Sequence, residues 1–295
     1  MSGAPDETLV RGLLREQHGD LADLELAFAA AGGDHQLWRL GPELVVRLPH
    51  HDDAAEQDVN ELAWLPAIAA RMPVSIPVPV RAGQASALFP RTWMITTWVT
   101  GTPADVAPLS AVEAADQLAA ALKALHVAAP AKAPATQRPT LDRLAARFEQ
   151  NLDYADEADV TALRDHWRTA VAAEESSGPP VWIHGDLHPS NVLTNDGELV
   201  GMIDFGLLSA GDPAVDLGAA WALLPAALMP RFFERYGTPD TATIRRAAGW
   251  AAYIGLSLIA MGQPRHRGEP WHRSAFLDIG RRTVRALSDH PVSRS

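Results

Sequence analysis

The sequence predicts an α+β fold in two lobes: a small N-terminal lobe with an antiparallel sheet and a larger, mainly helical C-terminal lobe. Short apolar runs typical of strands are frequent before residue 98, and alanine-rich helical patterns dominate after residue 101. This change places the boundary near residues 98–103, so we take residues 1–98 and 99–295 as the two lobes. The 295 residues are 47% hydrophobic, which is enough for a sizeable core.

Periodicity and turn residues predict four elements in the N-terminal lobe. They are a helix over residues 8–30, a hairpin of strands 37–40 and 44–48, a helix over 55–71 and a strand over 93–99. Gly41-Pro42 marks the hairpin turn. Pro66 should kink or end the second helix, because proline lacks the N–H that continues the helical bonding.

The C-terminal lobe should be mostly helical. Ser110 followed by Glu113 forms a capping box, which predicts that a helix starts there. Residues 247–264 carry no charge, but several glycines, Ser257 and Gln263 dilute their hydrophobicity. A helix buried in a large lobe therefore explains this stretch better than a membrane span. Since acidic residues stand where a signal peptide would carry bases, we expect a cytoplasmic protein.

Charge and cysteine content limit the classes of partner. The formal net charge of -11 argues against a general nucleic-acid or anionic-membrane surface and agrees better with a cationic small molecule. The absence of cysteine excludes disulfides, thiolate metal sites and a cysteine nucleophile. No pattern sets the oligomeric state, so a monomer and a homodimer both stay open.

A hairpin is also predicted in the C-terminal lobe. Two apolar runs, residues 191–194 and 199–203, flank the turn Asn195-Asp196-Gly197. Residues with oxygen-bearing side chains stand at both ends of this hairpin.

These oxygen-bearing residues are Asp186, Asn191 and Asp204. Asp186 and Asn191 precede or open the first strand, and Asp204 follows the second. Folding of the hairpin should bring all three to one end of the strand pair. Two carboxylates and an amide carbonyl form a hard oxygen site, which suits Mg²⁺ bridging phosphate oxygens.

Three longer strings surround these residues. They read His184-Gly185-Asp186-Leu187-His188-Pro189-Ser190-Asn191, Ile203-Asp204-Phe205-Gly206 and Gly211-Asp212-Pro213-Ala214-Val215-Asp216-Leu217. Their order and spacing resemble the aminoglycoside phosphotransferase family, which comprises antibiotic kinases and small-metabolite kinases. The first two also resemble the kinase catalytic loop and its Asp-Phe-Gly motif. The resemblance implies a protein-kinase-like two-lobed fold.

The same resemblance implies a function. It implies an enzyme that uses ATP, with GTP as the alternative donor, and Mg²⁺ to phosphorylate a hydroxyl of a small molecule. Asp186 would be the catalytic base, and Asn191 and Asp204 would hold Mg²⁺. An antibiotic such as an aminoglycoside or a macrolide is the expected acceptor.

The resemblance extends to nucleotide-binding residues. Arg47 stands where most kinases have a phosphate-contacting lysine, and Glu61 matches the acid that orients this cation. Backbone groups of a hinge would bond adenine, and two apolar side chains would pack beneath it. These hinge and adenine-packing residues would be Thr97, Trp98, Val99, Leu193 and Ile203.

Three alternatives accompany this hypothesis. His184, Asp186 and His188 are also compatible with a zinc site, although Pro189 and the kinase-like spacing disfavour it. Among enzymes, the alternative is a housekeeping kinase for an amino alcohol or a sugar. A catalytically silent nucleotide-binding scaffold is the third, and the presence of all three oxygen-bearing residues argues against it.

Overall fold

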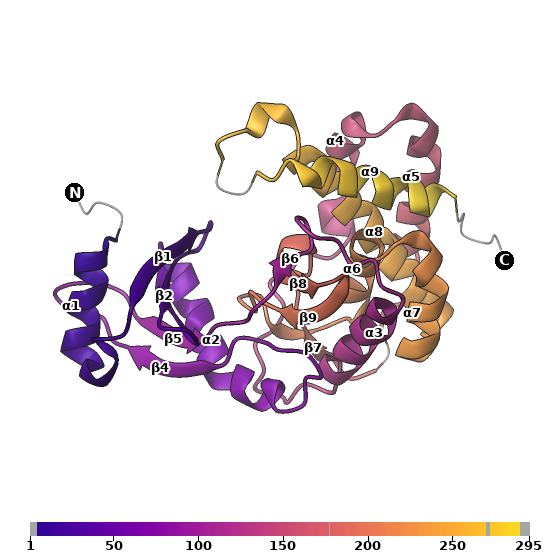
Figure 1. The fold of residues 1–295 in the computed structure, drawn as a ribbon. Helices are drawn as coiled ribbons and strands as arrows, with labels where there is room; N and C mark the ends of the chain where they lie inside the picture. The colour runs from indigo at the N-terminus through magenta and orange to yellow at the C-terminus, as the bar shows by residue number, and fades with distance from the viewer. Residues whose placement is uncertain (1–4, 177, 270–271, 290–295) are drawn as a thin grey trace. The chain divides into compact units, whose positions relative to one another are not determined.

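The computed structural model describes residues 5–176, 178–269 and 272–289. The chain divides into two compact units (Figure 1): unit 1 is Met1–Arg71 with Ser75–Thr100, and unit 2 is Met72–Val74 with Gly101–Ser295. Strands of one sheet dominate unit 1, and helices dominate unit 2. The α+β fold expected from the sequence is therefore confirmed.

Unit 1 contains a five-stranded antiparallel sheet in the order β1-β2-β3-β5-β4. Helix α1 packs on this sheet, and its buried Val10, Leu13 and Leu14 join a cluster with apolar residues of the strands. The elements are α1 (Glu7–Gln17), η1 (Gly19–Leu21), β1 (Leu26–Ala31), β2 (His35–Leu40), β3 (Leu44–Pro49), α2 (Asp52–Ala69), β4 (Pro79–Gly83) and β5 (Trp93–Thr97).

The first helix is shorter than the sequence predicts. It ends at Gln17, and Leu26–Ala31 forms the edge strand β1 instead of continuing the helix to residue 30. Arg11 donates to the carbonyls of Ala22 and Leu24, at 2.8 and 2.6 Å, and so folds the following turn back onto α1. Pairing of β1 with β2 then overrides the helical preference of its alanines.

The remaining predicted elements of unit 1 are present. Strands β2 and β3 form the expected hairpin, and Gly41 adopts the positive φ of 58° that its turn requires. Helix α2 continues past Pro66 to Ala69, so this proline lies in the last turn and does not end the helix. Pro66 lacks the N–H that would bond the carbonyl of residue 62, and only three helical residues follow it.

Unit 2 contains two small antiparallel sheets. One has the order β6-β8-β9 and the other pairs β7 with β10. A two-residue turn joins β8 to β9, and Asp196 and Gly197 both have positive φ, 50° and 82°, as a type I′ turn requires. The predicted hairpin is thus confirmed. The strands are β6 (Thr102–Pro103), β7 (Val181–Ile183), β8 (Val192–Asn195), β9 (Glu198–Met202) and β10 (Ser209–Gly211).

Helix α8 lies at the centre of the helices of unit 2, in contact with α4, α5, α6 and α9. It contains most of the uncharged stretch of residues 247–264 and is largely buried, as expected. Within the described residues, no helix combines the length and hydrophobicity that a membrane crossing requires. The α-helices are α3 (Glu113–Leu125), α4 (Ala145–Asn151), α5 (Glu157–Val171), α6 (Ala214–Leu223), α7 (Met229–Tyr236), α8 (Thr241–Met261) and α9 (Ala275–Ser288), and the short 3-10 turns are η2 (Asp142–Leu144), η3 (Leu152–Tyr154), η4 (Pro189–Asn191), η5 (Ala226–Leu228) and η6 (Pro264–His266).

The predicted capping box at Ser110 is wrong. Helix α3 begins at Glu113, and its N-cap residue, Val112, makes no side-chain cap. The backbone N–H groups of Ser110 and Ala111 instead donate to the carbonyl of Gly197, at 3.0 and 3.1 Å. The β8–β9 turn therefore holds this segment in place of a local cap.

Close packing of α8 against α9 depends on Gly280. A Cβ atom at this position would lie 2.5 Å from the carbonyl oxygen of Gly255. With any larger residue at position 280, the two helices could not lie this close together. We expect Gly280→Ala to lower the free energy of unfolding by about 1–3 kcal/mol, measured by urea denaturation. Gly33→Ala is the matched control, because no atom lies within 4 Å of its added Cβ. An equal loss in both variants would contradict this account.

Candidate functional site

A buried carboxylate fixes the backbone just before Asp186. Asp216 on α6 is fully buried and accepts the backbone N–H groups of His184 and Gly185, at 2.7 and 3.0 Å. Its Oδ2 also lies 3.1 Å from Nε2 of His126, whose Nδ1 lies 2.8 Å from the hydroxyl of Tyr236. The motif containing Asp216 therefore anchors the segment before Asp186.

Two opposing effects act on the pKa of Asp216. Burial raises the pKa, but the hydrogen bonds from His126 and from the N–H of Gly185 outweigh it, so the pKa lies below its ordinary value. Asp216 is therefore a carboxylate at neutral pH. Burial also raises the pKa of Tyr236 to about 12, reinforced by Asp216, so its hydroxyl stays protonated.

His184 connects this loop to the end of the β8–β9 hairpin. Its Nε2 lies 3.0 Å from the carbonyl oxygen of Ile203, and its Nδ1 lies 3.3 Å from the backbone N–H of Asp186. A neutral ring with its proton on Nε2 satisfies both contacts. The ring is buried beside Phe205, at 4.5 Å between centroids. His184 thus sets the spacing between the loop of Asp186 and the residue before Asp204.

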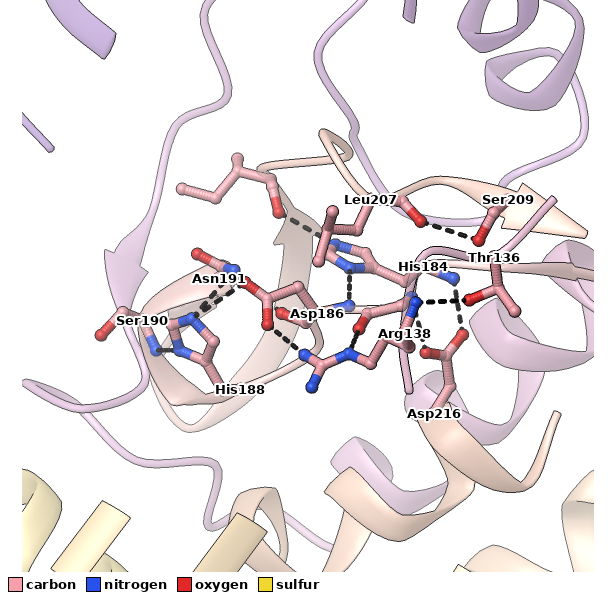
Figure 2. Close-up of polar contacts among 12 residues, drawn as sticks. Thr136, Arg138, His184, Asp186, His188, Ser190, Asn191, Leu207, Ser209 and Asp216 are labelled. Atoms are coloured by element: carbon pink, nitrogen blue, oxygen red, sulfur yellow. Dashed lines mark hydrogen bonds and ion pairs between the residues drawn. The ribbon is translucent and has the colours of Figure 1, made fainter. Parts of the chain in front are cut away.

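An arginine that the sequence did not indicate holds Asp186 itself. Arg138 donates through Nε to the carbonyl of Gly185 and through Nη2 to Oδ1 of Asp186, as Figure 2 shows. Oδ2 of Asp186 lies 3.8 Å from Nε2 of His188, too far for a hydrogen bond. Oδ1 of Asp186 is therefore bound by Arg138, whereas Oδ2 makes no hydrogen bond to Arg138 or His188.

The position of Arg138 follows from its backbone. Pro134 and Thr136 bond Ala210 on either side, at 2.8 and 3.3 Å, so this segment runs beside β10. The guanidinium of Arg138 also lies 5.9 Å from the ring centre of Trp250. In the sequence this segment has only the alanine, proline and lysine composition of a linker, and no local signal identifies Arg138.

The structure brings Asn191 next to both Asp186 and the residue before Asp204. The side-chain amide of Asn191 donates to the carbonyl of Asp186 at 2.9 Å, and Ile203 donates its N–H to the carbonyl of Asn191 at 2.9 Å. The amide also lies 3.1 Å from Nε2 of His188. These contacts fix the amide nitrogen, so Oδ1 of Asn191 points away from them (Figure 2).

Asp204 has the features of a residue that binds a cation. Its carboxylate is exposed, and no described residue donates a hydrogen bond to it or forms an ion pair with it. Its φ is 64°, a left-handed conformation that is uncommon outside glycine and frequent at functional sites. The donor set of Asp204 and Oδ1 of Asn191 contains only oxygen, which fits Mg²⁺.

The zinc interpretation gains no support. Among the residues that the structure describes, no group of three or more His, Asp or Glu side chains could hold a metal ion. The pKa of His188 is lowered by burial, although the charges of Asp186 and Asp204 oppose this, so its ring is neutral at pH 7.

In unit 1, Arg47 and Glu61 form a buried ion pair. Nη1 and Nη2 of Arg47 on β3 contact the two carboxylate oxygens of Glu61 on α2, at 2.6 and 3.0 Å. Nη2 also lies 3.3 Å from Oδ1 of Asp58, which in turn is 2.9 Å from Nε2 of His35. A planar guanidinium can contact two acids at once, whereas a lysine presents a single point charge. Asp58 was not among the residues predicted from the sequence, although it stands three residues before Glu61 on the same face of α2.

Two of the three predicted hinge residues use their backbone N–H groups in hydrogen bonds within unit 1. Thr97 donates to the carbonyl of Val78 at 2.9 Å, and Trp98 donates to that of Glu43 at 2.7 Å. Among the residues that the structure describes, none accepts a hydrogen bond from the N–H of Val99. Of the three, Val99 therefore has the donor that remains for a ligand.

The two predicted adenine-packing residues lie in unit 2. Leu193 is buried on β8 and pairs with Gly201 of β9. Ile203 follows β9 and is partly exposed, with both its N–H and its carbonyl engaged as described above.

The family comparison covers most of both units. Residues 25–250, more than half of the chain, match the model of the phosphotransferase enzyme family. An aminoglycoside 3'-phosphotransferase of Salmonella typhimurium is 28% identical over 163 residues, which are 50% of this chain and 60% of the relative. The chain thus spans less than two thirds of the length of that curated relative.

Solved structures show the same fold over nearly the whole chain. The GDP complex of aminoglycoside 2'-phosphotransferase-IIIa matches with a TM-score of 0.69 and 20% identity, covering 95% of this chain and 99% of that one. A macrolide 2'-phosphotransferase from Brachybacterium faecium matches with a TM-score of 0.60 and 21% identity, covering 92% and 97%. The protein-kinase-like fold expected from the sequence is therefore confirmed.

The buried carboxylate of Asp216 predicts a pH-dependent loss of stability. Because its folded pKa lies below the unfolded value of about 3.9, its stabilisation is complete above about pH 4 and is lost as the pH falls through the folded pKa. We expect Asp216→Asn to lower the free energy of unfolding by about 3 kcal/mol at pH 7. In urea denaturation the difference from the parent should narrow below pH 4. A difference that stays constant down to pH 3 would count against this role, and exposed Asp278→Asn is the control.

Proposed function

Because the chain belongs to the phosphotransferase enzyme family, we propose that it transfers the terminal phosphoryl group of ATP to a hydroxyl of a small molecule, with GTP as the alternative donor. The observation that carries this proposal is the arrangement at one end of the β8–β9 hairpin. There, Asn191 bonds the backbone of Asp186, and Asp204 presents a carboxylate that no described residue engages.

Asp186 is the proposed catalytic base. Its Oδ1 is held by Arg138, which leaves Oδ2 to accept the proton of the acceptor hydroxyl. The hydroxyl oxygen then bonds to the terminal phosphorus, and the bond from this phosphorus to the bridging oxygen of ATP breaks. The products are a phosphorylated alcohol and ADP. Proton removal of this kind contributes roughly 10²–10⁴-fold to the rate.

Asn191 and Asp204 are the proposed ligands of Mg²⁺. The ion supplies charge neutralisation on the phosphates when bound. The contacts of the Asn191 amide keep its oxygen directed outward. His184 keeps the segment before Asp204 at a fixed distance from the loop of Asp186.

The proposed nucleotide contacts from unit 1 are Arg47 and the hinge. Arg47, fixed by Glu61, would contact the phosphates, and the N–H of Val99 would bond adenine. The carbonyl groups of Thr97 and Trp98 complete the proposed hinge. Leu193 and Ile203 would pack against the adenine.

An antibiotic is the proposed acceptor. The aligned relative of Salmonella typhimurium is an aminoglycoside phosphotransferase, and a macrolide phosphotransferase shares the fold. We find no feature of the described residues that favours an amino alcohol or sugar kinase, and the unengaged Asp204 argues against a silent scaffold.

Acceptor-dependent release of ADP tests this function. The purified chain would be given Mg-ATP and a panel of hydroxylated antibiotics, and a product would be recognised by the mass gain of one phosphoryl group. We expect Asp186→Ala to lower kcat by at least about 10²-fold and to leave the affinity for Mg-ATP nearly unchanged, because only the base is lost. Normal turnover in this variant would refute the assignment of the base.

The metal ligand is tested with the same protein. Asp204→Ala should remove the Mg²⁺ dependence of nucleotide binding, measured by calorimetry with and without Mg²⁺. Asp278→Ala, which changes an exposed acid on α9, is the control. An unaltered affinity for Mg-ATP in Asp204→Ala would argue against a ligand role.

Arg138 should act by positioning Asp186. We expect Arg138→Ala to lower kcat by roughly 10²-fold, since small displacements of a base have effects of this size, while the KM for ATP stays nearly constant. Arg138→Lys should recover part of the rate, because one ammonium group can reach either Gly185 or Asp186 but has no planar fork to bridge them. Equal rates in the alanine and lysine variants would contradict a positioning role.

A further inference from the structure

A cavity of about 310 Å³ opens beside Asp186 within unit 2. Asp186 and His188 contribute from the loop, and the rest of the lining comes from Arg138 and from α4, α8 and α9. Figure 1 shows these three helices grouped in unit 2, and α8 contacts both of the others. Because the cavity borders the proposed base, it is the place where an acceptor hydroxyl would lie.

The longest wall of this cavity is apolar. Helix α8 contributes Ile254, Leu258 and Met261, which recur every three or four residues and so lie along one face. Phe276 of α9 continues this surface. The uncharged part of α8, residues 247–261, therefore serves the cavity as well as the core. Apolar walls favour the body of a ligand that loses little hydration on binding.

The charges around the cavity are unusual for a site that binds a polycation. Among its described lining residues, Asp186 is the only carboxylate, and Arg138 already pairs with it. Arg147 of α4 adds a second guanidinium, and no described carboxylate lies within ion-pair distance of it. Two arginines against one carboxylate leave a formal excess of one positive charge among the arginine and acidic side chains of the lining.

Several uncharged polar groups also face the cavity. Asn151, Tyr253 and Ser257 lie among the lining residues and offer an amide and two hydroxyls. Such groups can bond hydroxyls or carbonyls of a ligand, but they do not compensate several ammonium charges. The lining should therefore select ligands by their charge and by their apolar surface.

We propose that this cavity accepts an alcohol with a largely apolar body and at most one positive charge, and that it disfavours polycationic alcohols. The assignment rests on the proposed phosphotransferase function and narrows its acceptor to the chemistry of a macrolide rather than that of an aminoglycoside. This proposal differs from the expectation drawn from the net charge of the chain, which favoured a cationic acceptor.

The first test compares two acceptors in the ADP-release assay. A 14-membered macrolide and kanamycin would be measured with the complete chain at pH 7.5 and physiological salt. We expect kcat/KM to be at least about 100-fold higher for the macrolide, since several like charges placed together carry a penalty of this order. A kcat/KM for kanamycin equal to or above that of the macrolide would overturn the proposal.

The second test isolates charge from shape. Kanamycin and its fully N-acetylated derivative share their hydroxyls but differ in ammonium groups, so the ratio of their kcat/KM values reports charge selection. Arg147→Glu should raise the ratio of kanamycin to the derivative by about tenfold, because it adds the missing carboxylate. Arg281→Glu makes the same change on an exposed position of α9 that does not line the cavity, and the ratio should stay within about twofold.

The remaining outcomes separate this proposal from the function on which it rests. If Mg-ATP is bound and hydrolysed but neither acceptor class is phosphorylated, the assignment of the acceptor is overturned and the nucleotide chemistry stands. If Arg147→Glu and Arg281→Glu change the ratio equally, charge selection by the cavity is refuted. If the chain neither binds nor hydrolyses Mg-ATP, both proposals are wrong.

Discussion

The buried carboxylate of Asp216 is the constraint on which the geometry of unit 2 depends. Removing a carboxylate from water is unfavourable by several kcal/mol, and it is tolerated only where donors surround the charge. Here the donors come from two separate parts of the chain, the backbone N–H groups of residues 184–185 and the ring of His126, and Tyr236 contacts that ring in turn. The charge therefore joins α6 and the C-terminal end of α3 to the loop that carries Asp186, and α7 is connected through the His126 ring.

The parts of the site that were predictable from sequence are those with local chemical signals. The Asp196-Gly197 turn has a single favoured geometry, so it sets the register of β8 and β9 and with it the proximity of Asn191 to Ile203. The same holds for the β2–β3 hairpin, which carries Arg47. The roles of these residues remain proposals, but their placement follows from two short turns.

The parts that were not predictable depend on tertiary contacts. Arg138 meets Asp186 only because its segment pairs with β10, and residues 48 positions apart leave no periodic signal. The apparent capping box at Ser110 failed because the carbonyl of Gly197 accepts the N–H of Ser110, which the side chain of Glu113 would accept in a capping box. The alanines of β1 became a strand because a neighbouring strand offered hydrogen bonds. In each case a distant partner outweighed local propensity.

The wall that α8 and α9 give to the cavity couples ligand choice to stability. Leu258 and Phe276 belong at once to the hydrophobic core and to the wall of the cavity beside Asp186. A substitution there should alter ligand choice and thermodynamic stability together, so a change of specificity at these positions costs stability as well. Arg147 lies outside the core. Substitutions in α4 should therefore change ligand choice with less loss of stability than substitutions in the α8 wall.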